Sequence, residues 1–378
     1  MTRPYDVAVV GGGAIGLGIA WRSASLGLSV VVVDDQPGRG ASWAAAGMLA
    51  PVTEVHPGEE DLLRLNLASA ELYGDWVDEL EDVTSKDVGY RKSGTLLVAR
   101  DSDDAAALVE VLALQVRLGL RAERLRSREC RSLEPGLAPS VRGGIYVSGD
   151  HEVDNRALVT ALLDACRKVG VDFEMQRAIE VTGEAAVSGL VVEDGGRIAA
   201  GTVVVAAGVW SNDLGGLARG SIPELRPVKG QLLHLRGRPH AGIPTHVIRG
   251  LDFYAVPRGD GRLVVGASVE EQGFDRTITA GAVHLLLRDA VDVLPDLVEL
   301  ELTEIACGLR PATSDNTPAL GETSVPGLVT AVGHFRNGIL LTPITADLIA
   351  RLLVSGQAPE ALRPFSPRRF EVAAGAAS

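Results

Sequence analysis

The chain has 378 residues, 46% of them hydrophobic and 22% charged, which is typical of a globular protein with a large core and excludes a disordered chain. Its formal net charge of −13 disfavours nucleic acid and anionic membrane surfaces as partners. Its three cysteines form no CxxC pair and its seven histidines are dispersed, so the sequence predicts neither a disulfide framework nor a metal site.

Nothing in the sequence predicts export or a membrane span. The first predicted strand begins at Tyr5, which leaves no room for a signal peptide before it. No apolar run approaches the ~18 residues that a membrane-spanning helix needs. We therefore expect a cytoplasmic protein without a membrane partner.

The first 35 residues carry the strongest motif. A buried strand is predicted at 5–10, followed by a glycine-rich turn, a helix to about Ser25 and a second strand at 29–33. Asp34 and Asp35 close that strand. This order is the fingerprint of a dinucleotide-binding βαβ unit, although it does not distinguish NAD from FAD.

Each glycine of the turn has a physical role in the fingerprint. Gly11 permits the tight turn, Gly13 lets a pyrophosphate approach the backbone, and Gly16 lets helix and strand pack closely. Asp34 follows Gly16 by eighteen residues, near the place where a carboxylate binds ribose hydroxyls. A glycine-rich turn without a ligand is the alternative, and the full βαβ context disfavours it.

Small residues follow the second strand at 44–47, immediately before Met48. Three alanines and a glycine predict either a large ligand against the backbone or a small-residue helix packed on the sheet. The sequence favours neither of these two interpretations.

The middle of the chain alternates helices and strands. Hydrophobic periodicity predicts helices at 59–81, 101–118 and 155–168, with Ser102 or Asp103 capping the second and Asp154 or Asn155 capping the third. Strands are predicted at 94–99, 143–147, 171–175, 178–181, 187–192 and 203–208. The last of these strands returns to the central sheet and brings Ala207, Gly208 and Trp210 toward the cofactor.

The next third of the chain predicts an antiparallel sheet, with a hairpin turn at 259–261 and a helix at 279–294. The chain then returns to α/β structure, with a strand at 327–332, a turn at 333–338 and a helix at 339–353. Strands of the antiparallel sheet are predicted at 230–235, 245–249, 253–257, 262–267 and 302–309.

The expected fold class is α/β with an α+β second domain. A Rossmann-like domain is predicted from 1–85, 145–220 and 305–370, and an antiparallel-sheet substrate domain from 86–144 and 221–304. Residues 371–378 are predicted to be a flexible tail.

Four motifs together resemble the D-amino acid oxidase superfamily of FAD proteins over nearly the whole chain. They are the βαβ fingerprint, the GASWAAAGM segment at 40–48, the GLRPATSD segment at 308–315 with Pro318 and Gly321, and the GHFRNGILLTP run at 333–343. The AAAGM core of the second segment resembles the glycine-oxidising members of the superfamily. Asp34 replaces the glutamate that is commoner in the superfamily, and the shorter carboxylate can still bind ribose.

The resemblance implies a non-covalent FAD, with its ADP portion in the first domain and its flavin facing the antiparallel sheet. It implies that this cofactor is bordered by the pyrophosphate turn, the ribose-binding acid, the 41–48 segment, the backbone at Ile179 and the 334–340 run. With the residues already placed near it, the implied set is Gly11, Gly13, Ala14, Ile15, Gly16, Asp34, Asp35, Ala41, Ser42, Ala45, Ala46, Gly47, Met48, Ile179, Ala207, Gly208, Trp210, His334, Phe335, Arg336, Asn337, Gly338, Ile339 and Leu340.

The implied reaction is oxidative deamination of a small amino acid, namely glycine, sarcosine or a small D-amino acid. Hydride transfer to flavin N5 gives an imine, water gives the oxo acid and ammonia, and dioxygen gives hydrogen peroxide. A dehydrogenase with another electron acceptor and a non-catalytic flavoprotein subunit are the alternatives. The resemblance also implies a role in thiamine thiazole biosynthesis and a homo-oligomer, often a tetramer.

Arg310 is the candidate clamp for the substrate carboxylate, because a planar guanidinium binds a carboxylate through two parallel bonds. A surface ion pair with Asp315 is the alternative. Tyr254 resembles the site tyrosine of the superfamily, and its alternative is a half-buried strand residue. Arg336 is expected near the carboxylate or the product, or else on the surface.

His334 is not expected to act as a general base, since hydride transfer from a neutral amine needs none. A cysteine near Cys307 binds the flavin covalently in the related sarcosine oxidases. Cys307 is one residue out of register with it, and we expect a buried structural thiol.

Overall fold

The computed structural model describes residues 4–218, 220–237 and 242–371. Apart from Glu371, the predicted tail at 371–378 lies outside these residues. The described chain forms two eight-stranded sheets and a two-stranded ladder of β3 (Met48–Leu49) with β7 (His151–Glu152).

The first sheet contains the predicted βαβ unit, in which β1 (Tyr5–Val10), α1 (Ala14–Ser25) and β2 (Val30–Val33) follow one another. Its strand order is β17-β18-β11-β1-β2-β8, and every neighbouring pair is parallel except β17–β18. The hairpin of β9 and β10 continues from β11. The remaining strands are β8 (Asp172–Glu174), β9 (Ala178–Thr182), β10 (Gly189–Val192), β11 (Arg197–Val205), β17 (Ala319–Glu322) and β18 (Leu328–Val332).

Four helices pack together beside this sheet and bury a large apolar core. They are α1, α3 (Glu60–Thr84), α6 (Asn155–Lys168) and α8 (Thr342–Ser355). Trp21 and Tyr73 are fully buried among them. Because the strands are apolar on both faces, as parallel strands usually are, Val31 and Val33 point to a second core that includes Leu190 of the β9–β10 hairpin.

The second sheet is antiparallel except where β13 pairs with β4, in the order β16-β12-β15-β14-β13-β4-β6-β5. Side chains alternate across it. Leu233 packs with α7 (Ala280–Val293) on one face, and Leu232 packs with Ala46 on the other. Its strands are β4 (Thr95–Ala99), β5 (Glu123–Arg126), β6 (Gly143–Val147), β12 (Arg226–Arg236), β13 (Val247–Arg249), β14 (Tyr254–Pro257), β15 (Arg262–Gly266) and β16 (Glu301–Ala312).

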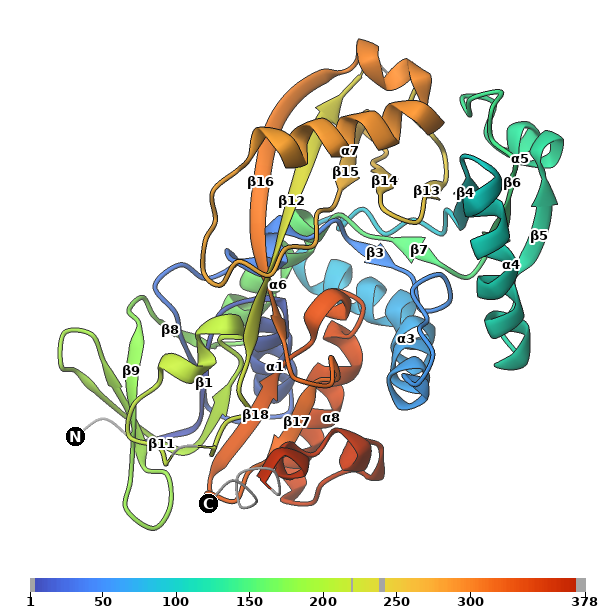
Figure 1. Ribbon diagram of the computed structural model, residues 1–378. Helices are drawn as coiled ribbons and strands as arrows, with labels where there is room; N and C mark the ends of the chain where they lie inside the picture. The colour runs from blue at the N-terminus through green and yellow to red at the C-terminus, as the bar shows by residue number, and fades with distance from the viewer. Residues whose placement is uncertain (1–3, 219, 238–241, 372–378) are drawn as a thin grey trace.

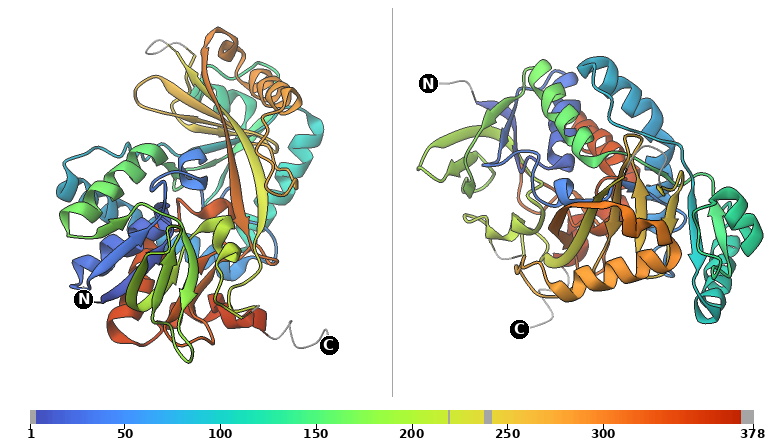
Figure 2. Two further views of the ribbon diagram at one scale, coloured as in Figure 1. Left: turned by 90° about the vertical axis from the view of Figure 1, so that its left-hand side faces the viewer. Right: turned by 90° about the horizontal axis from the view of Figure 1, so that it is seen from above.

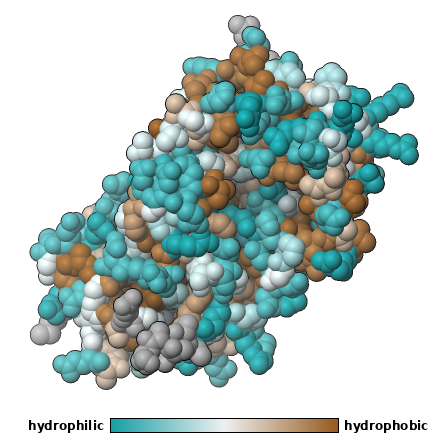
Figure 3. Space-filling view, viewed as in Figure 1, coloured by the Kyte–Doolittle hydropathy of each residue, from teal (hydrophilic) through white to brown (hydrophobic). Residues whose placement is uncertain are grey.

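Figure 1 shows the first sheet in the lower half of the molecule and the second in the upper half, with α7 lying across β16, β12 and β15. The left view in Figure 2 shows the long β12–β16 pair running between the two halves. In Figure 3 hydrophilic side chains cover most of the visible face, and apolar ones lie in scattered groups. The two sheets therefore form two halves joined by long strands.

The predicted fold class and most predicted elements are confirmed. Asp154 caps α6 by accepting from the N–H groups of Arg156 and Ala157. The predicted cap of the 101–118 helix was wrong, since Asp101 accepts the N–H groups of Asp103 and Asp104 at the start of α4 (Ser102–Arg117).

The helix predicted from residue 339 begins three residues later, as α8. A short 3-10 helix, η3 (Phe335–Asn337), precedes it, and Pro343 lies in the first turn of α8, where no N–H donor is needed. The sequence did not predict several short elements, which are α2 (Ala41–Ala44), β3, β5, β7, α5 (Ser127–Leu133), η1 (Gly208–Asp213), η2 (Pro295–Glu299), β17, η4 (Glu360–Phe365) and η5 (Pro367–Phe370).

The domain limits stay a prediction. β6 spans the predicted limit at 145, and β16 spans the one at 305, while both strands pair within the second sheet. A division by sheets would place each of these strands whole with the second domain.

Candidate active site

A cavity of about 1260 Å³ reaches from the glycine turn after β1 to the strands of the second sheet. Its turn end is defined by Gly11, Gly13 and Asp34. Most of the residues predicted to contact cofactor or substrate line it, namely Gly11, Gly13, Ile15, Asp34, Asp35, Ala41, Ser42, Ala45, Ala46, Gly47, Met48, Ala207, Gly208, Trp210, Tyr254, Arg310, His334, Phe335, Arg336, Gly338 and Ile339.

At the turn end, close packing explains the glycines. Gly11 has a φ of +105°, and a Cβ there would lie 2.5 Å from the carbonyl oxygen of Ala206. A Cβ on Gly16 would lie 1.9 Å from the carbonyl oxygen of Gly11. The first N–H of α1, from Ala14, donates to Ser42 Oγ at 3.0 Å, and no side chain caps the helix at Gly13. The turn is therefore held tightly, with the start of α1 beside the cavity.

The Asp34 carboxylate is fixed by the backbone at this end. Its Oδ2 accepts from the N–H of Gly12 at 2.6 Å, and its Oδ1 accepts from the N–H of Gln36 at 2.7 Å. Burial raises the pKa of Asp34, and the two backbone donors oppose that rise. The carboxylate lies at the cavity wall, where a ribose-binding acid belongs in the fingerprint.

The 41–48 segment runs between the cavity and the second sheet. α2 approaches β16 so closely that a Cβ on Gly308 would lie 2.7 Å from the Cβ of Ala44. Gly47 has a φ of +74°, and a Cβ there would lie 2.0 Å from the Val153 carbonyl oxygen. The small residues therefore allow tight packing against the second sheet, and a large ligand against this backbone stays a prediction for a segment that lines the cavity.

Arg310 and Tyr254 meet on the cavity face of the second sheet, above two glycines. A Cβ on Gly230 would lie 2.5 Å from the Arg310 guanidinium, and one on Gly266 would lie 2.6 Å from the Tyr254 hydroxyl. Arg310 Nη1 donates to the carbonyls of Ser268 at 3.2 Å and of Lys229 at 3.3 Å. The two side chains can thus lie flat over the sheet only because glycine lies beneath each.

Arg310 and Tyr254 also interact electrostatically. Burial raises the pKa of Tyr254, and the nearby Arg310 opposes that rise. Asp315, the predicted alternative partner of Arg310, instead pairs with Arg369 at 2.9 Å. Among the described residues, Arg310 has no carboxylate within 4.0 Å.

Arg336 lines the same end of the cavity, where its Nη2 pairs with Glu59 at 2.6 Å. A third arginine, Arg249, also lines it and pairs with Glu54 at 3.5 Å. We call this region, defined by Arg249, Arg310 and Arg336, the arginine end. Sequence analysis missed Arg249 and Glu54, and only the position of Arg249 at the end of a predicted strand gave a signal.

The turn at 333–338 also lines the cavity. His334 is buried, and its Nε2 lies 3.1 Å from Thr345 Oγ1. Burial lowers the pKa of His334 to about 3, so its imidazole is neutral at neutral pH. The hydroxyls of Ser69 and Tyr73 in α3 donate to the carbonyls of Leu340 and Ile339, which fixes the backbone after the turn.

Five predicted residues do not line the cavity. Ile179 is 44% exposed, and its neighbours Arg177 and Ala178 line the cavity instead. The others are held in tight packing beside it, and they are Ala14, Gly16, Asn337 and Leu340. Cys307 is partly buried. It lies three residues before Arg310 in β16, and side chains alternate along a strand, so Cys307 points to the opposite face of the sheet from Arg310.

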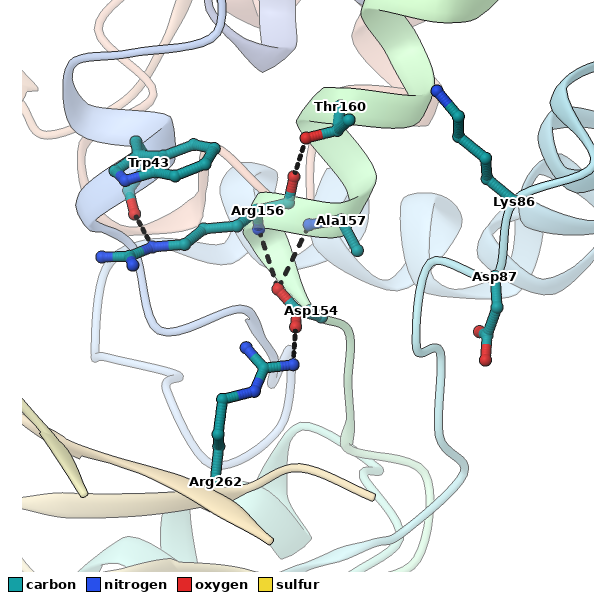
Figure 4. Close-up of a pocket in the computed structure, with 8 residues that line it drawn as sticks. All are labelled: Trp43, Lys86, Asp87, Asp154, Arg156, Ala157, Thr160 and Arg262. Atoms are coloured by element: carbon teal, nitrogen blue, oxygen red, sulfur yellow. Dashed lines mark hydrogen bonds and ion pairs between the residues drawn. The ribbon is translucent and has the colours of Figure 1, made fainter. Parts of the chain in front are cut away.

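A second pocket of about 440 Å³ is open and lies at the start of α6 (Figure 4). Its charged groups already have partners. Asp154 accepts from Arg262 at 2.7 Å, and Arg156 Nη2 pairs with Glu304 at 2.7 Å. Because these charges are satisfied, we place the active site in the larger cavity.

Within residues 4–218, 220–237 and 242–371, no group of three or more metal-ligating side chains lies close enough to hold a metal ion. None of the helices in this part of the chain is long and apolar enough to cross a membrane.

Comparison with known proteins identifies the family. Residues 6–352 match the model of the FAD dependent oxidoreductase family, DAO. The chain is 35% identical to a glycine oxidase of Geobacillus kaustophilus over 98% of both chains, and the crystal structure of a glycine oxidase from that organism has a TM-score of 0.89, at 34% identity over 97% of this chain and 99% of that one.

A bifunctional ThiO/ThiG protein of Synechocystis is 36% identical over 98% of this chain, and the chain spans 55% of the length of that relative. Since the family model and a full-length relative both match over nearly the whole sequence, this chain belongs to the family of FAD-dependent oxidoreductases.

Proposed function

We propose that this chain oxidises glycine and other small amino acids with FAD and dioxygen. The amine becomes an imine, which water hydrolyses to glyoxylate and ammonia when the substrate is glycine, and hydrogen peroxide is released. One observation carries the proposal. Arg310 and Tyr254 lie together at one end of a cavity whose other end has the dinucleotide turn.

The residues at the cavity wall fit FAD. The closely packed turn, the start of α1 at Gly13 and the backbone-fixed Asp34 are suited to the ADP portion. The 41–48 segment and the backbone at 334–340 would border the remainder. When bound, FAD supplies the two-electron acceptor that amine oxidation requires.

The protein side chains bind and orient the substrate. Among the residues that the structure describes, the guanidinium of Arg310 has no carboxylate partner, and it would take the substrate carboxylate, with Tyr254 donating its hydroxyl to the same group. Such a clamp fixes the angle of the substrate as well as its distance from the cofactor. His334 is neutral and held by Thr345, so its role is to position the turn.

The relatives named ThiO/ThiG suggest a role in making the thiazole of thiamine, for which the imine itself is the useful product. Sarcosine and small D-amino acids are the second candidate substrates. They are favoured by Val269, which lines the cavity and is 72% exposed, so this wall is open. A cytoplasmic homo-oligomer stays a prediction that light scattering and fractionation would test.

The test is peroxide release by the purified, FAD-loaded protein, with glycine, sarcosine, D-alanine and D-proline compared in parallel. We expect glycine to be among the best substrates. If sarcosine or a bulkier D-amino acid reacts and glycine does not, the substrate is wrong while the reaction stands. Bleaching of the flavin by glycine without oxygen, but no peroxide in air, would indicate another electron acceptor.

A further inference from the structure

The three arginines of the arginine end differ in their partners. Arg336 pairs with Glu59 at 2.6 Å, and Arg249 pairs with Glu54 at 3.5 Å. Arg310 alone has no carboxylate within 4.0 Å among the described residues. The region therefore has one uncompensated positive charge, which matches a substrate with a single carboxylate.

Arg249 lies on the same face of the sheet as the Arg310–Tyr254 pair. It is the cross-strand partner of Tyr254, and directly paired residues of antiparallel strands share a face. The Arg310 guanidinium lies over β12, and the strand of Arg249, β13, is the third strand from β12 in the sheet. At ~4.8 Å per strand, the backbones of β12 and β13 are about 14 Å apart. Tyr254 thus stands between two arginines that extend along one wall of the cavity.

Arg249 is only partly satisfied. Its Nη1 donates to the carbonyl of Thr53, but its buried Nε has no hydrogen-bond partner in the described part of the chain. The 3.5 Å contact with Glu54 is longer than the roughly 2.8 Å of a good charge-assisted hydrogen bond. Glu54 therefore neutralises the charge of Arg249 but leaves some of the N–H donors of Arg249 unused.

We propose that Glu54 makes the enzyme select against a second carboxylate on the substrate, because its own charge neutralises that of Arg249. This inference rests on the proposed function, since it takes Arg310 and Tyr254 as the site of the first carboxylate. A monocarboxylic amino acid binds there and faces a neutral Glu54–Arg249 pair. A dicarboxylic amine such as iminodiacetate brings its second carboxylate against Glu54, and like charges in contact cost free energy.

The test is the isosteric change Glu54→Gln, which removes the charge and leaves Arg249 free. We expect the ratio of kcat/KM for iminodiacetate to kcat/KM for glycine to rise about tenfold or more. The double variant Glu54→Gln with Arg249→Met should lose most of that gain, because the two positions are then neutral together, as in the wild type. An unchanged ratio in the single variant, or a gain of the same size in the double variant, would overturn the inference.

Glu304→Gln is the matched control, because Glu304 also pairs with an arginine, Arg156, but neither residue lines the cavity. Its ratio should equal that of the wild type, and an equal gain there would also overturn the inference. If Glu54→Gln does not accumulate as a flavoprotein, Arg249→Met alone decides. It leaves Glu54 uncompensated and should lower the ratio, so no change would contradict the inference.

Ligand binding separates this inference from the proposed function. Diglycolate and methoxyacetate are both ethers, but diglycolate carries two carboxylates and methoxyacetate carries one. Their dissociation constants can be measured from flavin absorbance. If no amine is oxidised but Glu54→Gln still favours diglycolate, the function is wrong and the inference stands. If glycine is oxidised but neither ratio moves, the function stands and the inference is wrong.

Discussion

The two ends of the cavity are built in different ways. The turn end is made by residues of one βαβ unit, and its geometry depends on close backbone contacts of Gly11 with Ala206 and of Gly16 with Gly11. The arginine end is made by side chains from β13, β14, β16 and η3 and from the loop that carries Glu54. The first should therefore be sensitive to any added atom, whereas the second should be sensitive to the loss of a charge.

The largest effect is expected at the turn end. Gly16→Ala would place a Cβ 1.9 Å from the Gly11 carbonyl oxygen, and only a backbone shift can relieve that contact. We expect unfolding in urea to show a loss of roughly 3 kcal/mol or more, together with loss of bound flavin. Gly74→Ala is the matched control, since it also lies in a helix and its Cβ would meet nothing closer than 3.9 Å. That change should be neutral or stabilise the protein slightly.

The next effect should appear at the arginine end without a change in folding. Arg310→Ala removes a bidentate charged contact, which is worth ~3 kcal/mol, so the KM for the amino acid should rise of the order of 10²-fold. Flavin content and thermal stability should stay near those of the wild type. Arg363→Ala, at an 82% exposed side chain, serves as the control. An unchanged KM in Arg310→Ala would show that Arg310 does not bind the carboxylate.

His334, in the turn at 333–338, should make the stability of the fold depend on pH. The folded pKa of His334 is about 3 and its ordinary pKa is 6.5, so the unfolded chain binds more protons below neutral pH. The contribution of His334 is complete above pH 6.5 and decreases as the pH falls. Between pH 8 and pH 5 the wild type should lose roughly 2 kcal/mol relative to His334→Gln, which does not titrate. Parallel unfolding curves for the two proteins over this range would contradict the buried, neutral histidine.

The smallest effect tests whether the arginine end also depends on a glycine contact. Gly230→Ala would place a Cβ 2.5 Å from the Arg310 guanidinium, whose flexible end can move. We expect about a tenfold rise in KM, equivalent to ~1.4 kcal/mol, with little change in the free energy of unfolding. Gly259→Ala, which would meet nothing within 4 Å, should leave KM unchanged. A loss of stability in Gly230→Ala without a change in KM would mean that Gly230 serves packing alone.

The sequence by itself determined the βαβ unit, because its strands, glycine turn, helix and Asp34 follow one another within residues 5–34, and hydrophobic periodicity predicted the long helices and most strands. The close contact of Gly11 with Ala206 was decided by the tertiary structure. Arg310 and Tyr254 were identified as separate candidates through resemblance to a family. Their meeting was decided only by tertiary structure, because strand order places Gly230 and Gly266 beneath them. The Glu54–Arg249 pair was missed for the same reason, since its members are 195 residues apart and no local pattern links a loop to the end of a distant strand.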